Sequence, residues 1–182
     1  AYNNAVNDRM LGFKPLKPTA TRIIGALAAT DATTEVLKDA KTINRKLQGQ
    51  RAKAIEQPTD PNTPAPKTIS TSQQSYDSLI EHLDKLIILL QAESSYTPNE
   101  SELQTAQLAS FKNELSIQNQ AVVDNYTTIS NARITRDKIL YAPKTGLCDI
   151  AADVKNYVKS IFGASSPEYK QVNSIQFKKI KP

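Results

Sequence analysis

The chain has 182 residues, of which 39% are hydrophobic and 23% are charged, and its net charge is +5 at neutral pH. A chain of this length can bury about 70% of the surface that its unfolded form exposes, so its core needs no disulfide or metal. The single Cys148 excludes an intramolecular disulfide and is typical of a buried, unreactive thiol.

The densest apolar run, Leu86–Leu90, is far shorter than the roughly 18 residues that a membrane span needs. The first residues are polar and show no signal peptide. We therefore expect a soluble protein of undefined compartment, compatible with a processed or extracellular product.

The charges follow a basic–acidic–basic order along the chain. Residues 1–57 carry a net charge of +5, residues 58–125 carry −6, and residues 126–182 carry +6. Such blocks favour charge complementarity within one bundle or between neighbouring copies.

Residues 1–57 are predicted to form an N-terminal helical half. Apolar residues three and four apart indicate two short helices on either side of Asp31, namely Ile23, Ile24 and Leu27, then Val36, Leu37 and Ile43. We expect Thr30 or Asp31 to cap the second helix. The following segment, residues 58–69, is rich in proline and is predicted to be an extended linker.

Residues 70–182 are predicted to form a second helical half. The strongest helical pattern comes first, with Tyr76, Leu79, Ile80, Leu83, Leu86, Ile87 and Leu90 on one face. Thr97, Pro98 and Glu100 then predict the start of a long helix through a capping box, and Pro143 and Gly146 end or kink it.

The carboxyl-terminal part is predicted to hold one more strong helix. Leu147, Ile150, Ala151, Val154, Tyr157, Val158, Ile161 and Phe162 form its apolar stripe, and Gly163 ends it. A short helical start follows at Ser166 and Pro167, and residues 172–180 alternate weakly, as in a strand or an extended arm. The sequence therefore predicts an all-α bundle of four to five main helices with an extended C-terminal arm.

The two ends of the chain resemble each other. An offset of 124 residues aligns identical residues at four positions that stand out: Tyr2 with Tyr126, Asn7 with Asn131, Arg9 with Arg133, and Thr21 with Thr145. An offset of 132 residues aligns Ile43 with Ile175. Both an internal duplication and a chance similarity of two helical ends explain these matches. A duplication would make residues 1–57 an incomplete first repeat, whose helical hairpin is missing or is borrowed from another subunit.

Several segments resemble an uncharacterised family of helical proteins from Bacteroidetes-type bacteria. The resemblance is carried by YTPNE, NARITRDKILY and VKNYVKSIFGASSPEYKQV, together with TRIIGALAATDATTEVLKDAKTINRKLQGQRAKA and the segment around SYDSLIEHLDKLIILLQ. Family members look longer at the amino end. The resemblance implies a helical fold of unknown function and no site residues.

Candidate sites are few. His82 is the sole histidine and has no second His or Cys at ligand spacing, so we expect a surface or boundary residue. No Gly-rich phosphate loop or Ser–His–Asp set is present. We therefore expect no catalytic, cofactor-binding or metal-binding residues and no enzyme activity.

Two other groups of residues are candidate sites. The residues of two basic clusters are candidates for anion contacts: Arg45, Lys46, Arg51, Lys53, Lys178 and Lys179. The residues that recur between the two ends are expected to bridge helices: Asn7, Arg9, Asn131 and Arg133. Where the long helix loses its stripe, Gln118 or Asn119 would set the register if buried.

The leading functional hypothesis is a non-catalytic structural or protein-interaction protein. Long amphipathic helices and alternating charge blocks favour self-assembly, with other copies or another protein as partners, as in a subunit of a larger assembly or filament. The alternative is a binder of an anionic partner, such as nucleic acid or an acidic surface, through the basic ends. Nucleic acid is the less favoured partner because neither cluster has interleaved aromatic residues.

Overall fold

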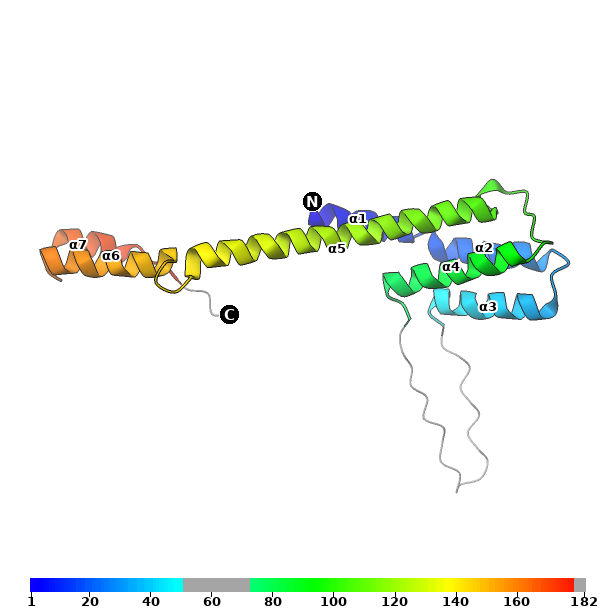
Figure 1. Ribbon diagram of the computed structural model, residues 1–182, viewed down its shortest axis with the longest axis horizontal. Coiled ribbons are helices and arrows are strands. Elements are labelled where there is room, and N and C mark those ends of the chain that lie inside the picture. Colours follow the sequence, from blue (N-terminus) through cyan, green and yellow to red (C-terminus); the bar gives the residue numbers. More distant parts are fainter. Residues whose placement is uncertain (51–72, 179–182) are drawn as a thin grey trace, which may run out of the picture. The chain divides into compact units, whose positions relative to one another are not determined.

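The computed structural model describes residues 1–50 and 73–178, and these residues form helices and loops without any β-strand. Figure 1 shows the helices in chain order: α1 (Tyr2–Phe13), α2 (Leu16–Ala28), α3 (Thr34–Gln48), α4 (Tyr76–Ala92), the 3-10 helix η1 (Ser101–Leu103), α5 (Thr105–Tyr141), α6 (Leu147–Phe162) and α7 (Pro167–Ser174). The predicted all-α bundle is confirmed, although the seven α-helices of the described residues exceed the four or five expected.

The chain divides into two compact units, Ala1–Asp124 (unit 1) and Asn125–Pro182 (unit 2). The division falls within α5, whereas the sequence predicted a linker at residues 58–69, all of which lie outside the described residues. The reason is that α4 packs on α3, which precedes the proline-rich segment, so residues from both sides of that segment share one core.

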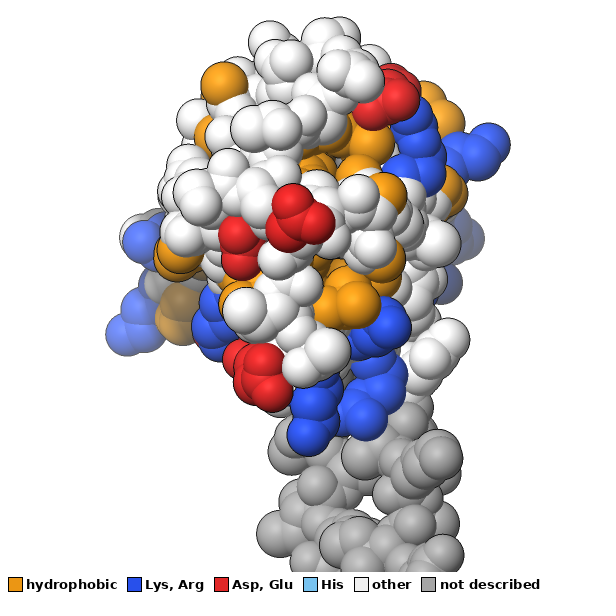
Figure 2. Space-filling model, turned by 90° about the vertical axis from the view of Figure 1, so that its right-hand side faces the viewer, with side chains coloured by type: hydrophobic (Ala, Val, Ile, Leu, Met, Phe, Trp, Pro, Cys, Tyr) orange, Lys and Arg blue, Asp and Glu red, His pale blue; other side chains and the backbone are white. Residues whose placement is uncertain are grey.

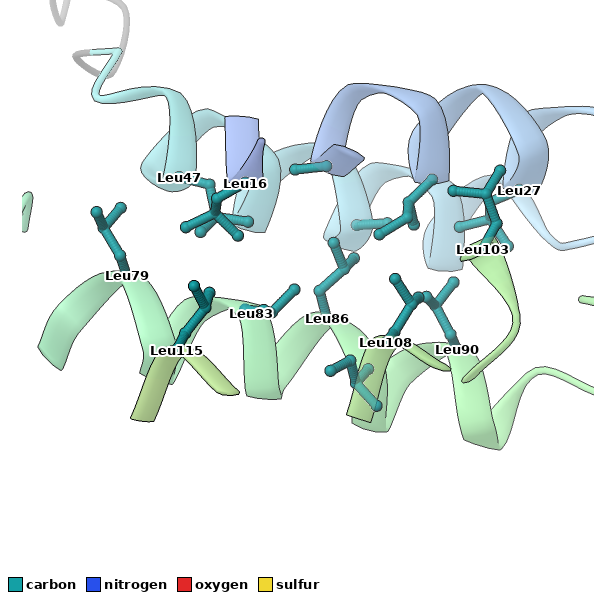
Figure 3. Packing of buried hydrophobic residues seen from close by; sticks show 14 of the residues in the cluster. Leu16, Leu27, Leu47, Leu79, Leu83, Leu86, Leu90, Leu103, Leu108 and Leu115 are labelled. Carbon is teal, nitrogen blue, oxygen red and sulfur yellow. The ribbon is translucent and has the colours of Figure 1, made fainter. Parts of the chain in front are cut away.

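The core of unit 1 is built from leucine stripes on neighbouring helices. In Figure 3, Leu16, Leu27 and Leu47 of α2 and α3 lie opposite the leucines of α4, η1 and α5. Nine large side chains of unit 1 are less than 2% exposed: Leu16, Ile23, Leu27, Leu47, Leu83, Leu86, Leu90, Leu108 and Leu115. Burying each such side chain contributes roughly 1.5–3 kcal/mol relative to leaving it in water, so this cluster stabilises the unit.

The surface of unit 1 is a mixture of charged, polar and apolar side chains. Figure 2 shows this mixture at the end of the unit where α2 meets α3, with basic and acidic groups around small hydrophobic areas. One exposed ion pair of unit 1 joins two elements: Arg22 of α2 donates to Glu102 of η1. The hydrogen bond and the charge of Arg22 lower the pKa of Glu102. This pair is exposed, so it contributes little to stability.

Helix α3 has a defined cap at each end. Its N-cap is Thr33, whose hydroxyl accepts from the Val36 amide at 3.3 Å, and not Thr30 or Asp31 as the sequence predicted. Thr30 instead donates to the carbonyl of Leu27 at the end of α2. At the other end Gly49 adopts φ +77°, and its amide bonds back to the Lys46 carbonyl. A left-handed residue at this position is the usual way to satisfy the last carbonyls of a helix.

We expect Gly49→Ala to lower the free energy of unfolding by about 1–2 kcal/mol, because a Cβ is disfavoured at positive φ. The added Cβ would also meet the Gln74 side-chain oxygen at 2.8 Å. Urea unfolding measures the change. The control is Gly25→Ala, in the interior of α2, where nothing lies within 4 Å of the new Cβ. There alanine should raise stability by about 0.5–1 kcal/mol; equal effects at both glycines would contradict this account.

The predicted capping box at Thr97 is wrong. Residues 93–100 form a loop, η1 follows at Ser101–Leu103, and α5 begins only at Thr105. The loop is held by Tyr96, whose buried hydroxyl donates to the Leu103 carbonyl at 3.0 Å. Burial raises the pKa of Tyr96 to about 12, with a smaller contribution from Glu100. Anchoring of Tyr96 and Leu103 in the core therefore overrides the local helix-start signal.

Two further elements differ from the sequence prediction. Helix α1 has few large apolar residues and was not predicted, although Ala5 and Phe13 are buried. The predicted start at Ser166 is confirmed, because the Ser166 hydroxyl accepts from the Tyr169 amide at 3.1 Å. The non-helical end is shorter than expected: α7 continues to Ser174, and only residues 175–178 of the described chain follow it.

Candidate interaction surface

Arg9 connects three helices of unit 1. Its guanidinium donates to the Asn119 side-chain oxygen at 2.9 Å, and Asn119 donates to Asp77 at 2.7 Å. The guanidinium carbon also lies 4.0 Å from the centre of the Tyr76 ring, which Phe13 meets edge-on at 4.7 Å. These contacts join α1, α4 and α5, and Asn119 is the polar residue that interrupts the apolar stripe of α5. The arrangement is suited to fixing helix register.

The other predicted bridging residues occupy different surroundings. Asn7 is exposed on α1, and Asn131 and Arg133 are exposed on the part of α5 that belongs to unit 2. Asn7 and Arg9 therefore belong to unit 1, whereas Asn131 and Arg133 belong to unit 2.

The predicted anion-contact residues are only partly described. Arg45 and Lys46 lie in the last turn of α3, where positive charge interacts favourably with the helix dipole. Lys178 is exposed near the end of the described chain. Arg51, Lys53 and Lys179 lie outside the described residues.

His82 is buried, which corrects the expectation of a surface or boundary residue. It is 4% exposed on α4, and neither ring nitrogen has a hydrogen-bond partner within the described part of the chain. Burial lowers the pKa of His82, and the positive charges of Lys46 and Lys85 lower it further. The helical stripe places position 82 beside Leu79, Leu83 and Leu86, so its imidazole is a neutral core group.

Acidification should therefore destabilise unit 1 through His82. Because the folded-state pKa lies below the usual value near 6.5, the unfolded chain binds the proton more tightly, and stability is lost as the pH falls below 6.5. For one titrating group, the free energy of unfolding cannot change by more than about 1.4 kcal/mol per pH unit. Urea unfolding between pH 7.5 and 5 measures it. His82→Phe should flatten the profile, and an unchanged slope in that variant would exclude His82 as the cause.

A shallow groove between α4 and α5 gathers acidic side chains. Asp77, Glu81 and Asp84 line it together with Lys112. Each carboxylate already has a partner: Asp77 accepts from Asn119, Glu81 from Lys85, and Asp84 from Lys112 at 2.7 Å. No three His, Cys, Asp or Glu side chains in residues 1–50 and 73–178 are placed to hold a metal ion. These acids thus serve as hydrogen-bond acceptors and ion-pair partners.

Unit 2 exposes a continuous apolar face on α6. Five side chains on that face are between 44% and 67% exposed: Leu147, Ile150, Val154, Tyr157 and Ile161. Their spacing of three and four residues places them along one side of the helix. Helix α6 has no buried residue within the described chain, in contrast to α2 and α4 of unit 1. We name these five side chains the α6 face.

A different side of α6 contacts α7. Ala151, Lys155 and Val158 are half-buried there, and so are Tyr169 and Val172 of α7. The Lys155 ammonium donates to the Ile175 carbonyl and lies 5.9 Å from the Phe177 ring. Contact with α7 therefore leaves the α6 face uncovered. The stripe itself was predicted from the sequence, but its exposure was not, because periodicity does not reveal whether an apolar face has a partner.

No helix in the described ranges is long and apolar enough to cross a membrane. No protein-family model, curated protein or solved structure matches the chain. The resemblance to a Bacteroidetes-type family of helical proteins therefore stays a prediction.

Proposed function

We propose that this chain is a non-catalytic protein-interaction protein that joins a larger assembly by docking the α6 face onto another helical surface. The observation that carries the proposal is the continuous exposure of Leu147, Ile150, Val154, Tyr157 and Ile161. Apolar patches of this kind mark interaction sites in soluble proteins. An amphipathic helix that lays such a face into an apolar groove is a common mode of recognition.

The energy that the α6 face offers is sufficient for a specific but weak contact. Covering a half-exposed apolar side chain contributes roughly 1 kcal/mol, so five of them offer on the order of 5 kcal/mol. Association costs several kcal/mol in lost freedom. Self-pairing of the α6 face alone should therefore be weak, whereas a partner with additional polar or ionic contacts would bind more tightly.

The experiment is sedimentation velocity of the purified chain over a wide concentration range. We expect the average mass to rise with concentration as α6 faces cover each other. Val154→Asp should abolish this rise, because docking would bury a carboxylate without a partner. The variant should still fold, since Val154 is half-exposed.

The matched control is Asn156→Asp, which adds the same charge to α6. Position 156 is exposed and points away from the α6 face, so its self-association should equal that of the wild type. If Val154→Asp and the control behave alike, the α6 face is not the interaction surface. A wild-type chain that stays monomeric at every concentration would remove self-assembly from the proposal.

A further inference from the structure

Unit 2 has no buried apolar side chain within its described residues. All eighteen buried hydrophobic side chains of the described chain lie between Ala5 and Val122, inside unit 1. In residues 125–178, by contrast, eleven large apolar side chains are at least 43% exposed. These eleven are the five of the α6 face and six others: Tyr126, Ile134, Ile139, Phe162, Ile175 and Phe177. The described part of unit 2 is therefore a set of helices without a core.

The contact between α6 and α7 does not replace a core. The apolar side chains at this contact, Ala151, Val158, Tyr169 and Val172, stay half-buried. Helix α7 is only eight residues long, and helices shorter than about 12–15 residues are marginal in water unless other elements pack on them. The pair therefore needs further contacts to be stable.

The part of α5 that belongs to unit 2 is a weak helix by itself. Residues 131–139 are exposed on every side of the helix, so packing contributes little to them within the described chain. The Thr135 hydroxyl donates to the Asn131 carbonyl at 3.0 Å, a side-chain bond that slightly destabilises a helix. Six β-branched residues, which lose side-chain freedom in a helix, lie within residues 127–139: Thr127, Thr128, Ile129, Ile134, Thr135 and Ile139.

From these observations we propose that unit 2 folds stably only together with unit 2 of a second copy of the chain, so that two incomplete units complete one core. The inference rests on the proposed function, because the α6 face is part of the surface that pairs, and it names the partner. A unit of this size without a core cannot offset the conformational entropy that its chain loses on folding. Homodimers whose protomers do not fold alone solve the same problem through their interface.

A second copy is the partner that the distribution of apolar surface favours. Unit 2 holds eleven of the sixteen exposed large apolar side chains in the described ranges, and the other five are divided among α1, α4 and α5 of unit 1. The surface that best matches unit 2 is therefore unit 2 itself. Charge does not oppose the pairing, because residues 147–174, which comprise α6 and α7, carry three Lys and three Asp or Glu, a net charge of 0.

The area on offer also fits a stable dimer. Covering the exposed part of one large apolar side chain removes on the order of 50–100 Å² from water. The α6 face alone thus offers roughly 250–500 Å², less than the 800 Å² or so that each partner of a standard interface buries. All eleven side chains offer up to roughly 550–1,100 Å². Pairing should therefore involve α5 and residues 175–178 as well as the α6 face.

The test is amide hydrogen exchange of the full chain over about three decades of concentration, with the mass measured in parallel by sedimentation. We expect amides of residues 147–174 to be unprotected in the dilute monomer and to become protected as dimers form. Once dimers dominate, protection should rise by roughly threefold for each tenfold rise in concentration, because the monomer fraction falls as the square root of concentration. Amides of residues 79–90 should not change, since the core around α4 lies within unit 1.

The two variants of α6 sharpen this test. Val154→Asp should remove the concentration dependence of residues 147–174, because pairing would bury a carboxylate without a partner. Asn156→Asp should keep it. Protection of residues 79–90 should equal that of the wild type in both variants. The wild-type series decides the question without either variant, so a direct effect of Val154→Asp on the α6 helix leaves the test intact.

Three results would overturn the inference. Protection of residues 147–174 in the monomer that equals that of residues 79–90 would mean that unit 2 folds without a partner. A mass that rises with concentration while this protection stays constant would separate association from folding, and it would leave the proposed function in place. Residues 147–174 that stay unprotected in a chain that is monomeric at every concentration would exclude a second copy as the partner.

Discussion

Leu86→Ala should lower the free energy of unfolding by about 2–5 kcal/mol, the range for removing a fully buried leucine and leaving a cavity. Leu86 is 0% exposed at the centre of α4 and belongs to the cluster that α2, α3 and α5 share. Because this cluster joins helices that are far apart in the sequence, a cavity in it weakens the contacts that hold unit 1 together. Urea unfolding followed by circular dichroism measures the loss.

The control for this substitution lies two residues further along the same helix. Ile88 is 57% exposed, so Ile88→Ala should change stability by no more than about 0.5 kcal/mol. If both substitutions cost the same, α4 does not present the leucine stripe to the core.

The second large effect is expected for Arg9 and Asn119. Each single change to Ala should cost about 1–3 kcal/mol, because it leaves a partly buried polar group without its partner. Since the two side chains bond directly at 2.9 Å, the double substitution should cost less than the sum of the single ones, with a coupling energy of about 0.5–3 kcal/mol. The measurement is a double-mutant cycle from urea unfolding curves.

Arg133, which the sequence comparison at an offset of 124 residues pairs with Arg9, provides a matched control. Arg133, its counterpart in sequence, is exposed, so Arg133→Ala should leave stability within about 0.5 kcal/mol of the wild type. Additive costs for Arg9 and Asn119 would show that the two residues act independently.

Helix periodicity predicted most of the architecture. The stripe of α4, the stripe of α6 and the Ser166 cap could be located from spacing alone, since apolar residues three and four apart define a helix whatever its surroundings. Helix α1 could not, because only Ala5 and Phe13 of its residues are buried. The capping box at Thr97 misled the prediction because the buried side chains of Tyr96 and Leu103 fix the loop before α5.

Contacts between residues that lie far apart in the sequence could not be predicted from it. The polar interruption at Asn119 was visible, but its bonds to Arg9 and Asp77 depend on how three helices pack. His82 looked like a boundary residue beside Glu81 and Asp84, and only the packing of α4 buries it. The exposure of the α6 face is of the same kind, since an apolar stripe is identical in sequence whether it is covered or bare.

The most direct test of the α6 face is amide hydrogen exchange of the dilute, monomeric chain. Helix α6 lacks buried residues whereas α4 is packed in a core, so amides of residues 147–162 should exchange on the order of 100-fold faster than those of residues 79–90. Exchange in α6 that is as slow as in α4 without any added partner would mean that its apolar face is already covered, and the account of an uncovered docking surface would be wrong.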